Sequence, residues 1–469
     1  MLTVPLDAES DTPLYEQIYN YIKKEIINGS LSYQDKLPSS RSLAANLQIS
    51  RNTVDLAYGQ LVSEGYIVSV PKSGYYVCRI GSLMHLGDSR KPVPEPRPAN
   101  RNTIRYDFNP FAIDIANFPY EIFRRLSRNV LNESNHELFL SGDRQGDPDF
   151  RSAIAKYLHV SRGAACTPDS IVVGAGTGYL LQLLFGLLSD PAGQPRLVAF
   201  ENPTFMKACQ IAATLGHQTT ALPLDSEGLR VDALEASGAD IAYITPSHQY
   251  PIGTIMSVRR RMDLLDWAAA APGRYIIEDD HDSEFRYKGR PIPPLQGMDT
   301  TGRVIYMGTF SRAVTPALRA GYMVLPEELL ARYKKEFSCY SCTVSRFDQA
   351  ILTDFITLGH FERHLNRMRT IYRAKHDLLL KSLRMFGTEI RITGEHAGLH
   401  LTVGFLRERS QEELIQKAEK AGIRLYGLNE HYIEPVPEHI PTLLIGFANL
   451  REEEITAGIR LLYSITHDA

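Results

Sequence analysis

A proline-rich polar stretch near residue 90 is the feature that most limits how this chain can fold. The segment SRKPVPEPRPANRNTIR, at 89–105, carries four prolines in alternate positions among arginines and has almost nothing to bury. Such a segment forms an extended, semi-rigid spacer. A chain of 469 residues is also too long for one ordinary core. We therefore expect a small head over 1–80, a linker over 81–105 and a large body over 106–469.

The composition is that of a soluble globular protein, with 43% hydrophobic and 22% charged residues. A net charge of −3 gives no general attraction to nucleic acid or to an anionic membrane, so any DNA contact must come from a local surface. The start, MLTVPLDAESDTPLYEQ, lacks the pattern of a secretory signal, and no run reaches the roughly 20 apolar residues that span a bilayer. Five scattered cysteines suit a reducing compartment. We expect a cytoplasmic protein that does not enter a membrane.

The head has the periodicity of three helices. Apolar residues at helical spacing over 13–28 predict a first amphipathic helix that ends at Gly29. A short second helix begins near Pro38 and Ser39, and the chain turns after it at 48–49. Ser50 then caps a third helix, whose predicted buried positions are Val54, Ala57, Tyr58 and Leu61. This order is helix, tight turn, helix.

Polar side chains fall on the exposed start of the third helix. Arg51 can bind a guanine edge or a phosphate, and Asn52 and Thr53 can bond to bases or to the backbone. After Gly65 the pattern alternates, which predicts a hairpin with Lys72 at its tip. Three helices alone leave a protein-binding module as an open alternative.

The full order of motifs, KLPSSRSLA, SRNTV, EGYI and KSGYYV, closely resembles the GntR-type winged helix-turn-helix over 12–78. The resemblance implies binding to double-stranded operator DNA. Residues 1–80 contain no excess of lysine and arginine over acidic residues, so the basic linker would add to the electrostatic attraction for DNA. The expected DNA-binding residues are Arg41, Ser50, Arg51, Asn52, Thr53, Lys72, Ser73 and Gly74.

In the body, short apolar runs alternate with longer helical patterns, which predicts a multidomain α/β protein with a mostly parallel sheet. Five runs end in polar or glycine-rich turns. Ligands of open α/β sheets bind at the carboxyl ends of the strands, so these turns should converge on one pocket. They lie at 174–178, 201–203, 245–248, 279–281 and 308–312.

Two features of these turns suit a phosphorylated ligand. A glycine turn that opens a helix binds anions through free N–H groups and the helix dipole. Thr309, Ser311 and Arg319 would add two hydroxyls and a guanidinium. Asp279, at the end of a hydrophobic strand, would be a buried carboxylate in need of a positive or proton-donating partner.

The motifs GDRQGDPDFRSAIAKYL, GAGT, ENPTF, TPSHQYPIGTIM, IIEDDHDSEF and VIYMGTFSR resemble the fold type I aminotransferases in order, and especially the body of MocR/GabR-type regulators. The resemblance implies a pyridoxal phosphate-dependent transferase-like fold with a large domain and a smaller C-terminal domain. It also implies a head-to-tail homodimer, with Asp279 pairing the pyridine nitrogen and residues such as Ala175 and Gly176 holding the phosphate. The expected cofactor or effector residues are Ala175, Gly176, Thr177, Phe205, His248, Asp279, His281, Thr309, Ser311, Arg312, Arg319 and Glu430.

The sequence departs from that family at four of these positions. Arg312 stands where the family has its cofactor lysine, and a guanidinium stays protonated and cannot link covalently to the cofactor's aldehyde. His281 and Phe205 replace aromatic hydroxyls, and Glu430 replaces an arginine for an effector carboxylate. A single replacement would fit an engineered change, whereas four favour natural loss of the covalent chemistry.

These departures predict that the body is not an enzyme. We expect a transcriptional regulator whose body senses a small ligand: an amino acid, an amine, or pyridoxal phosphate bound non-covalently or as an adduct. Two alternatives stay open, an aminotransferase that carries a DNA-binding head and a vestigial pocket that serves only dimerisation. The effector, the operator sequence and the sign of regulation are not readable from the sequence.

No metal site is predicted. Cys339 and Cys342 form a C-x-x-C without a second cysteine pair. His360 and His364 are four apart on a predicted helix, a spacing that also occurs by chance. The acidic run 279–282 resembles a metal cluster in composition, but consecutive residues at a strand end point to opposite sides.

Overall fold

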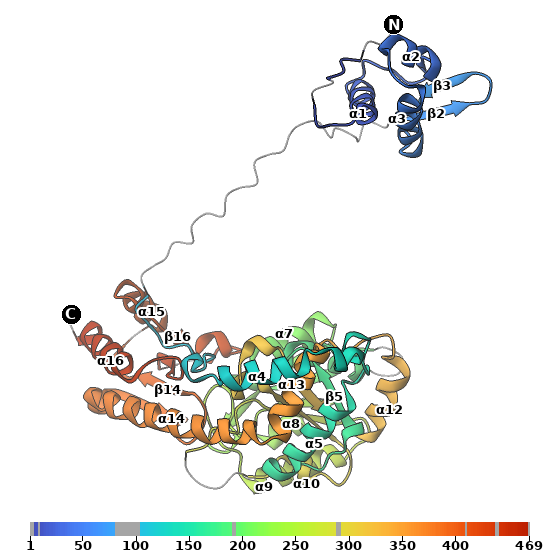
Figure 1. Ribbon diagram of the computed structural model, residues 1–469. Coiled ribbons are helices and arrows are strands. Elements are labelled where there is room, and N and C mark those ends of the chain that lie inside the picture. The colour runs from blue at the N-terminus through green and yellow to red at the C-terminus, as the bar shows by residue number, and fades with distance from the viewer. Residues whose placement is uncertain are drawn as a thin grey trace. The chain divides into compact units, whose positions relative to one another are not determined.

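The structure is a computed structural model that describes residues 4–7, 10–79, 104–189, 194–287, 292–408, 410–436 and 440–467. The chain separates into two compact units, Met1–Asn100 and Arg101–Ala469, and each is described by itself (Figure 1). The expected linker over 81–105 lies outside the described residues, except for its last two. Among the described residues, no helix has both the length and the apolar content needed to cross a membrane.

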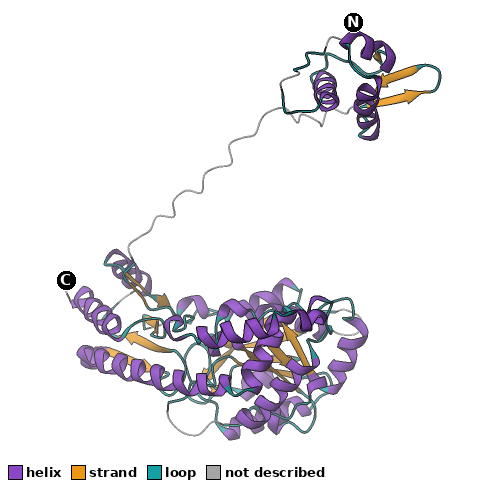
Figure 2. Cartoon of the chain, in the orientation of Figure 1, coloured by secondary structure: helices purple, strands orange, loops and turns teal. Residues whose placement is uncertain are grey.

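The head is built from three helices and a small antiparallel sheet in the order β1-β3-β2 (Figures 1 and 2). Its elements are α1 (Leu14–Ile27), β1 (Lys36–Leu37), α2 (Ser40–Leu47), α3 (Arg51–Ser63), β2 (Ile67–Val70) and β3 (Gly74–Val77). The paired strands β2 and β3 form the hairpin, or wing, that the alternating pattern predicts. The helix-turn-helix with a wing is therefore confirmed.

Local sequence explains where the head's helices begin and how they pack. The side chains of Ser39 and Ser50 accept hydrogen bonds from backbone N–H groups in the first turns of α2 and α3. Gln48, between these helices, adopts a left-handed conformation with φ 55°, which makes the turn tight. The side chains predicted to face the head's core are fully buried; they are Val54, Ala57, Tyr58 and Leu61.

The body is organised around an eight-stranded sheet in the order β5-β12-β11-β10-β9-β6-β7-β8. The run from β11 to β7 is parallel, while β12 is antiparallel to both of its neighbours and β8 to β7. The strands are β5 (Ile171–Gly174), β6 (Leu197–Asn202), β7 (Gln218–Asp225), β8 (Gly228–Leu229), β9 (Ile241–Ile244), β10 (Tyr275–Asp280), β11 (Val304–Thr309) and β12 (Gly321–Val324). The predicted mostly parallel α/β fold is confirmed.

Helices cover both faces of this sheet (Figure 2). Ile277 and Ile305 belong to a core with α6 (Thr177–Leu188) and α7 (Met206–Thr214). Their neighbours along the strands, such as Ile276, pack instead with α9 (Val258–Ala269) on the opposite face. Because successive strand residues point to opposite faces and both faces are buried, these strands read as continuous apolar runs. The other helices of this part are α4 (Tyr120–Val130), α5 (Pro148–Arg162), α8 (Val231–Ser237), α10 (Leu295–Met298), α11 (Phe310–Ala313), α12 (Glu327–Glu336) and α13 (Arg346–Thr357).

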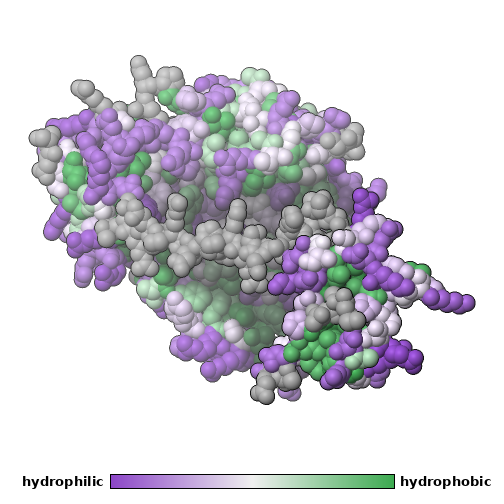
Figure 3. Space-filling model, turned by 90° about the horizontal axis from the view of Figure 1, so that it is seen from above, coloured by the Kyte–Doolittle hydropathy of each residue, from purple (hydrophilic) through white to green (hydrophobic). Residues whose placement is uncertain are grey.

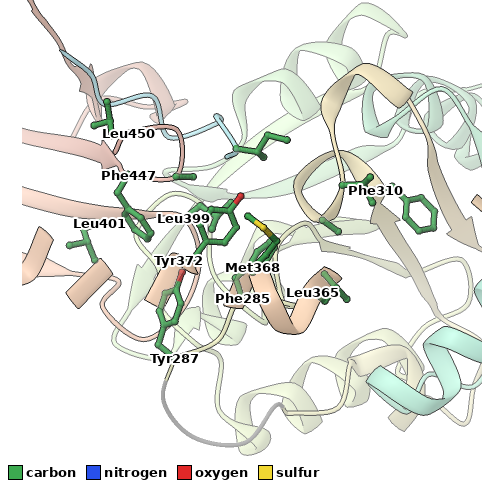
Figure 4. Close-up of a cluster of buried hydrophobic side chains, with 14 of the residues drawn as sticks. Phe285, Tyr287, Phe310, Leu365, Met368, Tyr372, Leu399, Leu401, Phe447 and Leu450 are labelled. Atoms are coloured by element: carbon green, nitrogen blue, oxygen red, sulfur yellow. The ribbon is translucent and has the colours of Figure 1, made fainter. Parts of the chain in front are cut away.

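The C-terminal part forms a smaller antiparallel sheet in the order β13-β14-β17-β16. Figure 4 shows side chains of the long helix α14 (His360–Leu383) between Phe310 on one side and Leu401 and Phe447 on the other. One hydrophobic core thus joins the large sheet to the smaller one. The remaining elements are β4 (Tyr106–Asp107), β13 (Ile390–Thr393), β14 (His400–Phe405), α15 (Gln411–Lys420), β15 (Ile423–Arg424), β16 (Tyr426–Gly427), β17 (Thr442–Gly446) and α16 (Glu452–His467).

A buried ion pair ties α14 to the start of the body. Lys375 Nζ lies 2.7 Å from Asp114 Oδ2 and also donates to the carbonyl oxygen of Ala448 at 2.7 Å. Both side chains are buried, and the ammonium holds the pKa of Asp114 below its usual value against the effect of burial. The pair connects three segments that are distant in the sequence.

Replacing Asp114 with Ala should destabilise the body by about 3–5 kcal/mol, because it leaves the Lys375 ammonium buried without its counter-ion. Urea unfolding followed by fluorescence measures this loss, since the single tryptophan, Trp267, lies in the body. The matched control is Glu121→Ala, which breaks an exposed pair with Arg124 and should cost less than about 1 kcal/mol. Equal losses in both variants would contradict this role of the buried pair.

Candidate ligand pocket and DNA-binding surface

A pocket with a cavity volume of about 240 Å³ lies at the carboxyl ends of β9, β10 and β11 and at the starts of α6 and α7. This is the edge of the sheet at which the sequence predicts that the turns converge. The structure brings eight of the expected residues to its wall: Thr177, Phe205, Asp279, His281, Thr309, Ser311, Arg312 and Arg319.

Asp279 presents a free carboxylate oxygen to this pocket. Its Oδ2 accepts a hydrogen bond from the Tyr243 hydroxyl at 2.5 Å, whereas its buried Oδ1 has no hydrogen-bond partner among the described residues. Burial raises the pKa of Asp279, and the charge of His281 and the Tyr243 hydroxyl only partly oppose this rise. A buried oxygen of this kind requires a cationic or proton-donating partner, which a ligand in the pocket can supply.

The opposite part of the wall is arranged to hold an anion. Gly176 precedes α6 with φ 82°, and a Cβ atom there would lie 2.8 Å from Arg319 Nη2. Arg319 Nη2 donates to the carbonyl oxygen of Ala175 at 3.1 Å, and Thr309 Oγ1 donates to Ser311 Oγ at 3.0 Å. The free N–H groups of the helix start, the two hydroxyls and the guanidinium suit a phosphate group.

His281 lies beside Asp279 and interacts with it electrostatically. Burial lowers the pKa of His281, but the carboxylates of Asp282 and Asp279 outweigh that effect and leave it raised. Asp282 lies between two imidazoles, with its Oδ1 3.1 Å from His248 Nδ1 and 3.3 Å from His281 Nε2. These imidazoles hold the pKa of Asp282 well below its usual value, although burial opposes them.

Arg312 lines the pocket, but its guanidinium already has partners in the chain. Nη1 donates to the carbonyl oxygen of Pro110 at 2.6 Å, and the guanidinium carbon lies 5.4 Å from the centre of the Phe111 ring. The second contact is a cation–π interaction. The charge of Arg312 therefore holds the segment before α4 against the pocket wall.

The other expected residues do not line this pocket. The Ala175 N–H donates to Thr343 Oγ1 at 2.9 Å, and Ala175 contributes its carbonyl oxygen instead. His248 is buried beside Asp282. Glu430 lies in the short helix η6 (Asn429–His431) and lines a separate polar hollow with Glu412. Its charge still acts on Tyr250, a residue of the main pocket.

Sequence reasoning missed several residues of the site. Lys207, Thr245 and Tyr250 line the pocket, and Tyr243 holds Asp279. Tyr243 lies within the apolar run of β9, where nothing in the pattern separates it from a core residue. Thr245 belongs to the predicted turn 245–248 but was not singled out as a ligand-binding residue, and Tyr250 lies two residues beyond that turn.

The head presents the residues expected to bind DNA. Arg41, Ser50, Arg51, Asn52 and Lys72 are exposed. Arg51 forms an ion pair with Asp55 at 3.3 Å one turn further along α3. The turn of the β2–β3 hairpin projects from the head and is hydrophilic (Figure 3), and the remaining expected residues, Thr53, Ser73 and Gly74, are half-buried.

Comparison with known proteins assigns both units. Residues 14–77 match the family of bacterial regulatory proteins of the gntR type, and residues 114–461 match aminotransferase class I and II. The HTH-type transcriptional regulator YhdI of Bacillus subtilis is 39% identical over 98% of this chain and 97% of its own. The probable rhizopine catabolism regulatory protein MocR of Rhizobium meliloti is 31% identical over 98% and 95% of the two chains. The pyridoxine biosynthesis regulator PdxR of Corynebacterium glutamicum is 30% identical over 92% and 91%.

Solved structures share the fold of the body. The multiple substrate aminotransferase of Thermococcus profundus superposes with a TM-score of 0.70 at 24% identity, over 79% of this chain and 92% of its own. The kynurenine aminotransferase of Pyrococcus horikoshii gives 0.69 at 24% identity with the same coverage. Aminotransferases of this fold family normally bind pyridoxal phosphate.

These matches correct one prediction. The expectation that the body is not an enzyme, drawn from Arg312 and the other departures, is wrong, because the body matches aminotransferase class I and II and shares the fold of solved aminotransferases. One side chain in the pocket does not by itself exclude catalysis by such a domain.

The relatives that match over almost the whole chain are regulators, and the two family matches account for the head and for most of the body. This chain therefore belongs to the MocR-type HTH transcriptional regulators, DNA-binding proteins that join a GntR winged helix to an aminotransferase-like domain.

Proposed function

We propose that this regulator binds operator DNA through α3 and the wing, and that the pocket of its body binds pyridoxal phosphate or its adduct with an amino acid or amine. The observation that carries the ligand proposal is that Asp279, whose Oδ1 has no hydrogen-bond partner among the described residues, lines the same pocket as Thr309, Ser311 and Arg319. In this proposal the spacer over 81–105 connects the two units.

The head supports a contact between the start of α3 and the major groove. Exposed Arg51 and Asn52 lie on the first turn of α3, the part of a recognition helix that meets base edges. The hairpin tip at Lys72, and Arg41 in α2, offer positive charge to phosphates on either side. Ser50 is already used as the cap of α3, which fixes the first turn that carries the reading residues.

Replacing Arg51 with Ala should weaken binding to the DNA just upstream of the protein's own gene by about 10- to 100-fold, because a bidentate contact is lost. Footprinting and a binding titration at fixed salt measure the change. Lys24→Ala is the matched control, since Lys24 is an exposed basic residue on α1. Unchanged protection with Arg51→Ala would remove α3 from the proposed interface.

The pocket residues fit the two ends of pyridoxal phosphate. Asp279 would pair with the protonated pyridine nitrogen, and the start of α6 with Thr309, Ser311 and Arg319 would hold the phosphate. When bound, the cofactor supplies an electron-withdrawing ring and an aldehyde that reacts with amines. Arg312 offers no amine to that aldehyde, so the proposed binding at this position is non-covalent.

Two variants test separately the contacts to the phosphate and to the pyridine nitrogen of the ligand. Arg319→Gln should weaken binding of both pyridoxal phosphate and inorganic phosphate by about 10- to 100-fold, because a charge-assisted hydrogen bond is lost. Asp279→Asn keeps the shape and should weaken only pyridoxal phosphate by a similar factor, since phosphate has no pyridine nitrogen. Equilibrium dialysis with each probe measures these affinities.

The control for this pair is Arg460→Ala, an exposed arginine of α16. Equal effects of Asp279→Asn on both probes would contradict the proposed orientation. Recovery of the cofactor on a peptide after borohydride reduction would contradict non-covalent binding, and Lys207 would be the amine in the pocket to examine.

Ligand binding should change DNA binding by the homodimer, which we propose to be head-to-tail. A ligand that prefers one arrangement of the two heads shifts the population toward it. We expect pyridoxal phosphate, alone or mixed with amino acids, to raise the thermal stability of the protein and to change its footprint on the upstream DNA. No shift in melting temperature with any mixture would support the alternative of a pocket used only for dimerisation.

A further inference from the structure

The wall of the pocket beside His281 contains a cluster of ligand-type atoms that the proposed cofactor does not use. One nitrogen of His248, one nitrogen of His281 and one carboxylate oxygen of Asp282 all lie within 4.8 Å of one another. Two of the three side chains are fully buried, and His281 reaches the pocket. We propose that these three residues bind a divalent transition-metal ion of the Zn²⁺ type, with an open coordination position that faces the pocket.

The distances within the cluster already approach those of a metal site. A Zn²⁺ ion binds histidine nitrogen and carboxylate oxygen at about 2.0–2.2 Å, so tetrahedral ligands lie roughly 3.3–3.5 Å apart. Asp282 Oδ1 is 3.1 Å from His248 Nδ1 and 3.3 Å from His281 Nε2. The two histidine nitrogens lie within 4.8 Å of each other, so they have to approach by up to about 1.5 Å for tetrahedral binding.

The bonding of His281 supports a shared central atom. His281 Nε2 is buried and lies 3.3 Å from Asp282 Oδ1, so the nitrogen and the carboxylate oxygen already share one small volume. Two imidazoles and one carboxylate are also a donor set that divalent transition metals bind with positions left open.

The backbone holds these residues in place. The sheet strand β10 ends at Asp280, so His281 and Asp282 lie beyond it and are not bound by the alternation of a strand. The sequence-based prediction of no metal site in the run 279–282 assumes that strand alternation continues to Asp282. The sequence also does not show that His248 lies beside this run. Gly398 leaves room for the cluster, since a Cβ atom there would lie 2.1 Å from His248 Cε1 and 2.9 Å from Asp282 Oδ2.

The surroundings suit a positive ion. Asp282 is one negative charge in the cluster, and Asp279, with a free Oδ1, interacts with His281 from the same strand end. The guanidinium of Arg312 also faces His281, but it donates to Pro110. The open position would bind a carboxylate or amine of the pocket ligand; this role rests on the proposed function, whereas the metal site does not.

The experiment uses the full-length protein, freed of metal by dialysis against a chelator and titrated with Zn²⁺ by calorimetry at about pH 8, because binding of a metal ion displaces protons from its ligands. Co²⁺ then serves as a second probe, through its visible absorption. We expect one Zn²⁺ per chain and a Co²⁺ spectrum of low coordination number. His281→Gln and Asp282→Asn should each weaken Zn²⁺ binding by at least about 10- to 100-fold.

Two controls make the result decisive. His360→Gln alters a different pair of histidines, His360 and His364, which are four residues apart on α14. It should leave Zn²⁺ binding unchanged, because His360 contacts Arg125 and Arg363. Arg319→Gln should also keep the metal, so a failure of pyridoxal phosphate binding is distinguishable from a failure of the metal site. If Asp282→Asn does not fold, as judged by circular dichroism, His281→Gln decides alone. Absence of Zn²⁺ binding, or equal binding by wild type and His281→Gln, would overturn the proposal.

Discussion

The burial of three consecutive acidic residues at the end of β10 is the constraint on which the pocket depends. An unpaired buried carboxylate is costly, so each needs a partner. Glu278 accepts hydrogen bonds from the backbone N–H groups of Leu295 and Gln296. Asp280 accepts hydrogen bonds from the Arg162 guanidinium and the Tyr306 hydroxyl. Asp279 points to the other side, because strand residues alternate, and one of its oxygens is left for a ligand. Among the described residues, Glu201 Oε1 and Asp280 Oδ1 also lack hydrogen-bond partners, but of these three acids it is Asp279 that lines the pocket together with Thr309, Ser311 and Arg319.

The charges around that acid select a ligand with charges of both signs. His281, Arg312 and Arg319 contribute positive groups to one pocket, while Asp279 contributes the negative one. A ligand that carries both a phosphate group and a protonated ring nitrogen matches this separation of charges. A simple anion or a simple cation would match only one of the two. Glu430 lines a separate hollow, yet its negative charge acts on the wall: burial raises the pKa of Tyr250, and the charges of Asp282 and Glu430 add to that rise.

The sequence predicted the architecture better than it predicted the side chains that support the residues lining the pocket. Val54 and Leu61 were placed correctly in the head because helical spacing reports burial, and the strand ends were found because parallel strands read as apolar runs. The role of Tyr243 and the pairing of His248 with Asp282 were not predicted, since both depend on which strands are neighbours in the sheet. That order, β11-β10-β9-β6, is not written in any local pattern. The prediction drawn from Arg312 failed differently: it treated one residue as deciding the chemistry of a whole domain.

The contact between Arg312 and Pro110 gives the pocket a physical link to the entry of the chain into the body. Covalently, the head is joined to the body through the segment that precedes β4, and Pro110 and Phe111 follow β4 within a few residues. Arg312 holds both residues while it lines the pocket. A ligand anion that competes for this guanidinium would weaken the hold, because one side chain cannot satisfy both at full strength. In the proposed function, the free energy of ligand binding would therefore act on the segment that leads to the DNA-binding head, without any rearrangement of the sheet itself.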